Sequence, residues 1–517
     1  MSDPTRDAFS WHPEPELIGF REEARSRPAL ERLGASAWEV CLDYLYREAM
    51  RRPVAPDSYP ELRRRLFPDG APEKAPAAPR SSSDVLAEFG RRLAPFQYNS
   101  QHPRSFSYFT PPPLVLSIVG ELLAQWLNQG VDVWHAGPSG ALVEEEVVRW
   151  LCELAGFGPE GFGVLTSGGV MANIMGLALA RDVHLRGLLG GQVPRGRDLE
   201  GVRVYASDQA HFSIARALDV LGFPPETLSV VESDERFRLR GEPVAAAVAR
   251  DRAAGLLPLA IAGVAGSTNT GSVDRVDELA DLCEREGLWL HVDAAYGGAA
   301  RLSQRLAGRV PDLHRADSLT MDPHKWFFQA LDIGGLVVKR RGDLPATFRR
   351  DPEYYRSGRE GQEPLNWYQY SIEGTRRFRG LKLWLSWKHL GSEGLGRLVE
   401  MNVELAAYLA RRCRESDDLE ALPEEPELSV VCFRHLPGGR AAARALEPAA
   451  LDRYQDSLQR ALAASGEGWV STTRLRGRTF LRAGIINYMS TEADVDRVLA
   501  VLRELSGAAV AEALRPQ

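Results

Sequence analysis

The sequence contains few cysteines, and those it has are scattered. Cys41, Cys152, Cys283, Cys413 and Cys432 lie far apart, and no two of them form a CxxC pair. An odd number of separated cysteines argues against a disulfide framework and against a zinc cluster. We therefore expect reduced, mostly buried thiols in a cytoplasmic protein and no bound metal.

Long apolar runs and blocks of like charge are also missing. The richest apolar stretch, residues 114–127, is too short and too polar to span a bilayer. The first residues lack the basic and apolar regions of a secretory signal. The formal net charge is -7, with acidic and basic residues interleaved. This balance excludes a nucleic acid or an anionic membrane as the expected partner, because both attract basic surfaces.

Lysine is the scarcest of the common charged residues. Of 63 basic residues only five are lysines, namely Lys74, Lys325, Lys339, Lys382 and Lys388. The chain otherwise uses arginine wherever a positive charge is needed. A lysine inside a sequence motif is therefore more informative here than in an average protein.

The pattern of apolar and turn residues predicts three parts in a chain of 517 residues. Residues 1–105 show helical patterns, including a helix over 37–52, and a loop over 71–83. Residues 106–390 alternate short apolar runs with helical stretches, which is typical of an α/β domain with a parallel or mixed sheet. Residues 391–517 predict a smaller α+β domain. The expected strands are 163–166, 202–205, 260–264, 288–292, 335–338, 428–433 and 479–485, and the expected closing helix is 491–505.

Two candidate motifs directly follow predicted strands, where open α/β sheets bind ligands. In residues 166–173 (TSGGVMAN), paired glycines before a helix let the backbone approach an anion such as phosphate. A plain strand-to-helix turn is the alternative. In residues 207–213 (SDQAHFS), His211 stands at a strand end, and its alternative is a structural histidine.

Two further motifs contain a carboxylate and a lysine in unusual settings. Residues 291–298 (HVDAAYGG) place Asp293 at the end of an apolar strand, where a charge needs a partner. A protonated ring nitrogen fits that need beside the small residues, and a buried arginine is the structural alternative. Residues 321–326 (MDPHKW) place Lys325 in apolar company that disfavours an ammonium, as in lysines that form Schiff bases. The alternative is a lysine that extends from the edge of the core.

These features in this order suit a phosphorylated pyridine aldehyde, with a carboxylate that keeps the ring nitrogen protonated. The motifs SDQAH (207–211), HVDAAY (291–296) and DPHKW (322–326) also resemble those of the group II pyridoxal-dependent decarboxylases. That family includes aromatic-L-amino-acid, glutamate and diaminobutyrate decarboxylases. The resemblance covers about residues 102–388 and is weaker to the end. It implies fold type I, the aspartate-aminotransferase type of large domain, with pyridoxal 5'-phosphate (PLP) as cofactor, and a homodimer with shared active sites.

The resemblance also implies roles for individual residues. Lys325 matches the Schiff-base lysine, Asp293 the partner of the pyridine nitrogen, and His211 the histidine that stacks on the ring and helps to place the substrate carboxylate. The remaining residues implied at the cofactor are Gly169, Val170, Thr268, Ala295 and His324. Tyr354 falls in a polar segment, 351–369, that is similar to the mobile catalytic loop, and it matches the tyrosine that protonates the substrate carbon after CO2 has left. A surface tyrosine without function is the alternative there.

Three residues depart from the family pattern. Val170 replaces the Ser or Thr that usually contacts phosphate, and Pro111 replaces a threonine near the substrate. Asp132 replaces an aromatic residue of the substrate pocket. An acidic residue there favours a substrate whose side chain carries an amine or a hydroxyl group. Phe106, Tyr108 and Phe109 still supply an aromatic wall.

The sequence therefore predicts a PLP-dependent decarboxylase of an L-amino acid, which is its small-molecule partner. An aromatic amino acid is the favoured substrate. Three alternatives use the same cofactor: decarboxylation of a glutamate-like or diaminobutyrate-like substrate, aldehyde formation or carbon–carbon lysis, and cofactor binding without catalysis. A nucleotide-binding oxidoreductase has no support, because no GxGxxG motif opens a βαβ unit.

Overall fold

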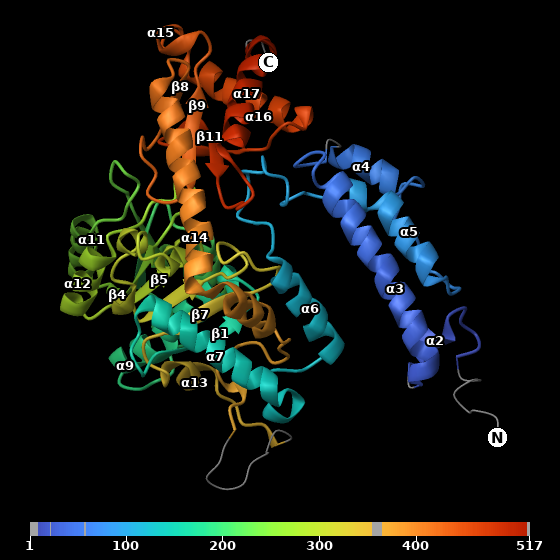
Figure 1. Cartoon of the computed structure of the whole chain (residues 1–517). Coiled ribbons are helices and arrows are strands. Elements are labelled where there is room, and N and C mark those ends of the chain that lie inside the picture. Colours follow the sequence, from blue (N-terminus) through green and yellow to red (C-terminus); the bar gives the residue numbers. More distant parts are fainter. Residues whose placement is uncertain (1–8, 21, 56–57, 354–363, 514–517) are drawn as a thin grey trace.

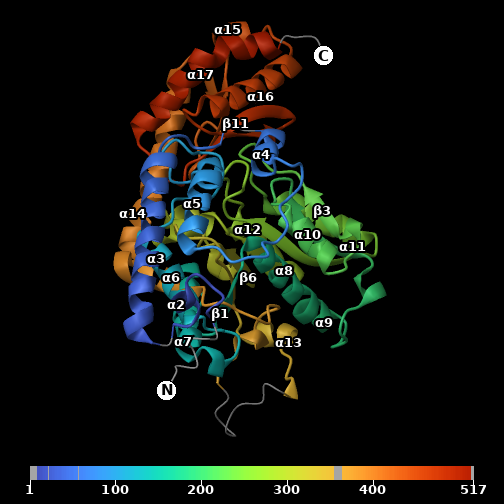
Figure 2. The ribbon, with the colours of Figure 1, turned by 90° about the vertical axis from the view of Figure 1, so that its right-hand side faces the viewer.

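The computed structural model describes residues 9–20, 22–55, 58–353 and 364–513. It shows an N-terminal group of helices, a large unit around a seven-stranded sheet, and a small unit around a four-stranded sheet (Figure 1). A view turned by 90° shows the small unit at one end of the large one, with the N-terminal helices along one side (Figure 2). None of the helices in these ranges has the length and apolar character needed to cross a membrane.

The N-terminal helices stand apart from the large sheet (Figure 1). The predicted helix over 37–52 is part of a longer helix that begins at Glu23 and stays helical, with one wider turn, to Glu48. On this helix Trp38 is 55% accessible and Cys41 is exposed, whereas the other four cysteines are buried, so the expectation of mostly buried thiols holds for four of the five. The helices of this group are α2 (Pro15–Ile18), α3 (Glu23–Asp43), α4 (Tyr59–Leu66) and α5 (Ser82–Arg92).

The large unit contains a mixed sheet with strand order β1-β7-β6-β5-β4-β2-β3. Its strands are β1 (Phe162–Thr166), β2 (Val202–Ser207), β3 (Leu228–Val231), β4 (Leu257–Val264), β5 (Trp289–Asp293), β6 (Ser318–Met321) and β7 (Gly334–Val338). Its helices are α6 (Val115–Leu127), α7 (Pro138–Ala155), α8 (Gly169–Leu179), α9 (Arg186–Leu188), α10 (Ser213–Val220), α11 (Gly241–Ala253), α12 (Val276–Glu286) and α13 (Asp343–Phe348). The five strands predicted for this part are present, and β3 and β6 are additional.

The direction of the strands places their carboxyl ends together. Strands β3, β2, β4, β5 and β6 run parallel, whereas β7 is antiparallel to both β6 and β1. Two reversals cancel, so β1 runs in the same direction as β6. The segments that follow β1, β2, β4, β5 and β6 therefore meet at one edge of the sheet, where ligands bind in open α/β folds.

The small unit packs three helices against an antiparallel sheet of order β10-β11-β9-β8. Leu409, Leu458 and Leu502 come from these three helices and share one apolar core with the sheet. Gly391 has a φ of 64° and breaks the longest helix, α14, so that the chain passes from one unit to the other without the strain of a side chain. The elements are α14 (Gly380–Glu415), β8 (Leu419–Ala421), β9 (Val430–His435), α15 (Gly439–Ala443), α16 (Pro448–Ser465), β10 (Ser471–Leu475), β11 (Arg478–Gly484) and α17 (Glu492–Ala513).

The segment from Asn99 to Phe106 fastens the N-terminal part to the small unit. The backbone N–H of Phe106 donates to the carbonyl of Trp469, and the carbonyl of His102 accepts from the side chain of Asn487. His102 is 2% exposed, and burial lowers its pKa to about 4. The imidazole of His102 is therefore neutral in the folded protein at neutral pH.

We expect this histidine to make the protein less stable in acid. A folded pKa of about 4 lies below the unfolded value of 6.5, so its stabilising contribution is complete above pH 6.5 and is lost as the pH falls toward 4. Between pH 8 and pH 5 the contribution to the free energy of unfolding is about 2 kcal/mol. Urea unfolding at the two pH values measures it, and His102→Gln should lose less stability than the wild type. The exposed His389→Gln is the control, and a His102→Gln variant with the full wild-type loss would contradict the prediction.

Candidate active site

A cavity of about 350 Å³ lies at the carboxyl edge of the large sheet, and seven of the predicted residues line it. These are Gly169, Val170, His211, Asp293, Ala295, His324 and Lys325. All of them lie at or soon after the end of a strand. The glycine segment comes after β1 and His211 after β2. Asp293 is the last residue of β5, and Lys325 comes after β6. The remaining lining residues are Ser167, Gly168, Met171, Asn173 and Asp322.

The backbone of the glycine segment lies very close to the side chain of Asp322. A Cβ at Gly169 would stand 2.7 Å from the carboxylate of Asp322, so only glycine fits there without a shift. The N–H of Gly169, at the start of α8, donates to that carboxylate at 2.9 Å. The start of α8 therefore already binds an anionic oxygen, as expected for a helix N-terminus.

Lys325 lines the cavity and forms an ion pair. Its Nζ is 3.2 Å from Oδ2 of Asp322, and its side chain is 23% exposed. The apolar surroundings predicted from the sequence are thus only partly correct, because a buried carboxylate three residues earlier faces the amine. The apolar side is formed by Trp326, which is fully buried, stacks on Tyr296 with ring centroids 4.7 Å apart, and donates from Nε1 to Asn402.

Asp293 is a buried carboxylate held by two donors. Its Oδ1 accepts the N–H of Ala295 at 3.1 Å, and its Oδ2 accepts from the amide of Asn173 at 2.8 Å. These bonds stabilise a negative charge in a site that is only 6% exposed. The predicted structural alternative, a buried arginine partner, is not seen among the described residues. The carboxylate is instead available to a cationic group in the cavity.

The histidines of the cavity are neutral. Burial is the main cause that lowers the pKa of His211 and of His324, and the carboxylates of Asp293 and Asp322 oppose that shift. Nδ1 of His211 lies 2.7 Å from Oγ of Ser213. Nδ1 of His324 accepts the N–H of Ile333 at 3.3 Å.

Five other predicted residues do not line the cavity. Phe106 is 1% exposed and belongs to the core of the small unit, so it forms no wall of this cavity. Tyr108 is 55% exposed and packs on Trp469. Phe109 packs on Tyr296, with ring centroids 4.4 Å apart. The last two of the five are Thr268, whose carbonyl accepts from Arg482, and Asp132, whose carbonyl accepts from Tyr368. Tyr354 lies outside the described residues.

Asn173 and Asp322 line the cavity but were not predicted as site residues, although both lie inside the quoted motifs. The signal for Asn173 is a polar side chain in the apolar helix run 170–177, since buried amides need partners. The signal for Asp322 is a carboxylate three residues before the lysine. Both side chains are about 1% exposed.

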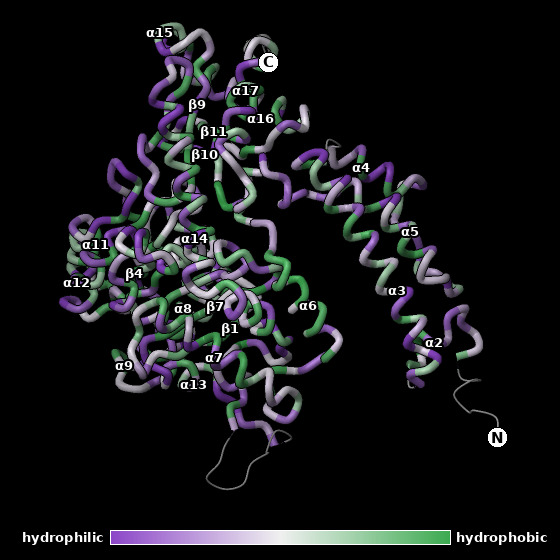
Figure 3. The backbone as a smooth tube through the Cα atoms, in the orientation of Figure 1, coloured by the Kyte–Doolittle hydropathy of each residue, from purple (hydrophilic) through white to green (hydrophobic). Residues whose placement is uncertain are grey.

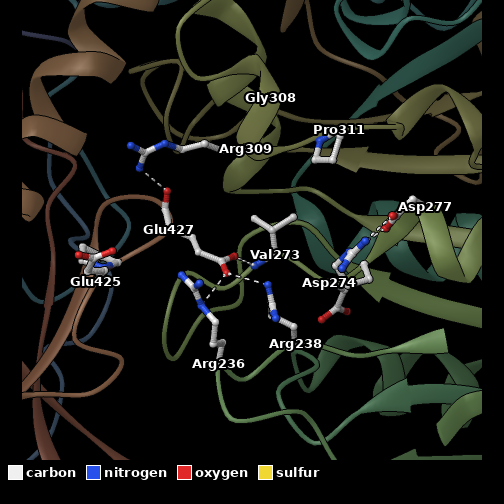
Figure 4. A pocket seen from close by; sticks show the side chains of 12 residues that line it. Arg236, Arg238, Val273, Asp274, Asp277, Gly308, Arg309, Pro311, Glu425 and Glu427 are labelled. Atoms are coloured by element: carbon white, nitrogen blue, oxygen red, sulfur yellow. Dashed lines mark hydrogen bonds and ion pairs between the residues drawn. The ribbon is translucent and has the colours of Figure 1, made fainter. Parts of the chain in front are cut away.

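A second cavity, also of about 350 Å³, lies between the large and small units and is rich in arginine (Figure 4). Its arginines have partners within the chain. Arg309 donates to the carbonyl of Glu427 at 2.7 Å, and Arg236 lies 3.7 Å from the carboxylate of the same residue. Arg238 pairs with Asp234 at 2.8 Å. This cavity therefore contains an ion-pair network that joins the two units, and it differs in chemistry from the cavity at Lys325.

Comparisons with known proteins agree with the geometry at Lys325. The family described as "Pyridoxal-dependent decarboxylase conserved domain" matches residues 60–436. An aromatic-L-amino-acid decarboxylase from Bacillus atrophaeus is 30% identical over 93% of this chain and 96% of its own length. An L-2,4-diaminobutyrate decarboxylase from Acinetobacter baumannii is 28% identical over 77% of this chain and 79% of its own. The crystal structure of Oryza sativa TDC with PLP and tryptamine covers 94% of this chain and 98% of its own, with a TM-score of 0.83 and 25% identity. These likenesses confirm the predicted fold type I architecture.

Proposed function

Because the chain belongs to the pyridoxal-dependent decarboxylase family, whose members are PLP-dependent carboxy-lyases, we propose that it decarboxylates an aromatic L-amino acid to the amine and CO2. The observation that supports the chemistry is the cavity that joins Lys325, Asp293 and His211 at one sheet edge. The support for an aromatic substrate is the aromatic decarboxylase that aligns over 93% of the chain.

The residues of the cavity fit the cofactor. The N–H of Gly169 is bonded to Asp322, so the next N–H groups of the helix start, at Val170 and Met171, are those offered to the phosphate, and the small side chain of Ala295 leaves room for a flat ring. The carboxylate of Asp293, which has no cationic partner among the residues that the structure describes, suits a protonated ring nitrogen. Lys325 carries the amine that joins the cofactor aldehyde.

The residues have separate tasks in the proposed reaction. PLP, when bound, accepts the electrons of the bond between Cα and the departing carboxylate. Asp293 would hold a proton at the ring nitrogen of the cofactor, and Lys325 would supply the amine that attaches the cofactor to the chain. His211 lines the same cavity and is proposed to contact the substrate carboxylate. The burial of Asp293, which is 6% exposed, strengthens its electrostatic contacts. Tyr354 is proposed as the group that returns a proton to Cα.

The experiment is a panel of carboxyl-labelled amino acids given to the purified protein with PLP. We expect labelled CO2 and one equivalent of amine, fastest with tryptophan, tyrosine, phenylalanine or DOPA. Faster release from diaminobutyrate or glutamate would overturn the aromatic assignment, and the diaminobutyrate relative makes that the second candidate. Aldehyde, ammonia and peroxide in place of the amine would overturn simple decarboxylation.

We also propose that the working unit is a homodimer. The outward face of α6 exposes Val115, Leu122, Trp126 and Leu127, each more than half accessible, and this helix stands out as apolar in Figure 3. Phe20, in the turn between α2 and α3, is 59% accessible and packs edge-on against Trp126 of α6. Exposed apolar side chains gathered in this way mark an interaction site. A second copy of the chain is the proposed partner.

A charged residue on this face should separate the subunits. We expect the wild type to sediment at about twice the chain mass of 57.1 kDa. The double variant Leu122→Glu, Trp126→Glu should sediment as the monomer, because it would bury two carboxylates at the contact. Leu188→Glu, at a 50% exposed site on α9, is the control and should remain dimeric. A wild type that sediments as a monomer at micromolar concentration would contradict the proposal.

A further inference from the structure

The amide of Asn173, at the wall of the cavity, makes four hydrogen bonds. Asn173 lies on α8 and is 1% exposed. Its Nδ2 donates to Oδ2 of Asp293 and to Oγ of Ser213, each at 2.8 Å. Its Oδ1 is 2.6 Å from the hydroxyl of Thr320 and 3.0 Å from Nε2 of His291. An amide has two donors and two acceptor positions, so every one of them is used.

The charge of Asp293 fixes which way this amide points. A carboxylate only accepts hydrogen bonds, so the NH2 group of Asn173 must face it. The reversed amide would set a carbonyl oxygen against the carboxylate, which is unfavourable in a buried site. The Oδ1 atom of Asn173 therefore faces Thr320 and His291, which must both donate.

The other side of the network is consistent with this assignment. His291 donates from Nε2, so its Nδ1 is bare and accepts the hydroxyl of Ser318 at 2.8 Å. The oxygen of Ser318 in turn accepts Nε1–H of Trp289 at 3.0 Å. His291 is fully buried, and burial lowers its pKa, so the neutral form that this pattern needs is the form present.

On the cavity side the same logic reaches His211. The oxygen of Ser213 accepts from Asn173, so its single hydroxyl proton is free to donate to Nδ1 of His211 at 2.7 Å. The backbone N–H of Ser213 also points at Nδ1, at 3.3 Å. Two donors directed at one ring nitrogen require that nitrogen to be unprotonated. The ring proton of neutral His211 is then on Nε2, and no hydrogen bond to Nε2 is seen within the described part of the chain.

We propose that Asn173 is a positioning residue that acts through Ser213 to hold His211 as the Nε2–H tautomer, with this proton directed at the substrate. The network starts at the carboxylate of Asp293 and ends at the ring of His211, so one chain of hydrogen bonds sets both groups. That the Nε2–H group of His211 donates to the substrate carboxylate rests on the proposed function. The tautomer itself is a property of the protein without cofactor.

Charged groups around His211 do not reverse this state. Asp293 from the end of β5 and Asp322 before the lysine favour the protonated ring, whereas Lys325 and Arg216 oppose it. Burial has the largest effect and lowers the pKa of His211. The ring is therefore neutral at neutral pH, and the position of its one proton is decided by Ser213.

The test is nitrogen NMR of the cofactor-free protein labelled with ¹⁵N in its ten histidines. His211→Asn identifies the signals of His211 by their loss. In the wild type we expect a bare Nδ1 and a protonated Nε2 at pH 8. Ser213→Ala removes the donating hydroxyl, and Asn173→Asp offers an oxygen that draws the hydroxyl away from His211. Both should move a measurable share of the ring proton to Nδ1, whereas Thr320→Val, on the far side of the amide, should leave the His211 signals in place.

With PLP bound, Ser213→Ala should lower kcat by roughly 10- to 100-fold. A wild-type His211 with its proton on Nδ1, or unchanged His211 signals in Ser213→Ala, would overturn the proposal even if the enzyme releases CO2. The expected signals together with no CO2 from any amino acid would leave the tautomer established and overturn the proposed function instead. Ser213→Ala removes one oxygen only, so the test does not depend on the folding of Asn173→Asp.

Discussion

Replacement of Lys325 by alanine is expected to lower CO2 release by roughly 10⁴-fold or more, because no other group of the cavity can bind the cofactor aldehyde covalently. The variant keeps His211, Asp293 and the helix start at Gly169, so it should still bind PLP, though without the absorbance of the bound wild-type cofactor. Labelled CO2 and the absorbance spectrum of the purified variant measure the two effects.

Two matched variants separate covalent chemistry from charge. Lys325→Arg keeps the positive charge next to Asp322, 3.2 Å from Nζ in the wild type, but a guanidinium stays protonated and forms no bond to an aldehyde. It should be as inactive as the alanine variant. Lys339→Ala removes an exposed lysine after β7 and should keep wild-type activity. An active Lys325→Ala, or an active Lys325→Arg, would refute the role of this amine.

Asp293→Asn is expected to lower kcat on the order of 10³-fold, because an amide cannot hold a proton on the ring nitrogen. The change also removes one of the two oxygens that accept from Ala295 and Asn173, so one buried donor loses its partner. The larger share of the loss should appear in kcat, since the charge matters most while the bond to the carboxylate breaks. Steady-state kinetics with the best amino acid of the panel measure it.

The control for this variant is another buried acid of the same unit. Asp251 is 5% exposed on α11 and accepts from the hydroxyl of Tyr205 at 3.0 Å, away from the cavity. Asp251→Asn keeps an oxygen for that bond and should retain activity within about threefold. Equal losses in the two variants would mean that the effect of Asp293→Asn is structural and not chemical.

The sheet and its functional edge are predictable from the sequence because both depend on local patterns. Apolar runs of four to eight residues predict β1, β2, β4, β5 and β7, and each motif residue is found directly after a strand or at its end. The antiparallel direction of β7 is not local, since it depends on which strands pair. Because β7 is antiparallel to both β1 and β6, the glycine segment after β1 lies at the same sheet edge as Lys325.

The residues that the sequence misplaces are those whose surroundings come from distant parts of the chain. Phe106 was expected beside the substrate, but the segment before it pairs with residues near Trp469, which draws its ring into the core of the small unit. Asn173 reads as one more residue of an apolar helix, and only the fold brings Asp293, Ser213, Thr320 and His291 to its amide.

The most direct test of the account is to locate the cofactor on the chain. Borohydride reduction turns the linkage between a lysine amine and the cofactor aldehyde into a stable secondary amine, and mass spectrometry of peptides then identifies the lysine. With only five lysines in the chain the assignment is unambiguous. The account predicts the added mass on the peptide that contains Lys325 and on no other. Label on the peptides of Lys74, Lys339, Lys382 or Lys388 instead, or no label at all, would contradict it.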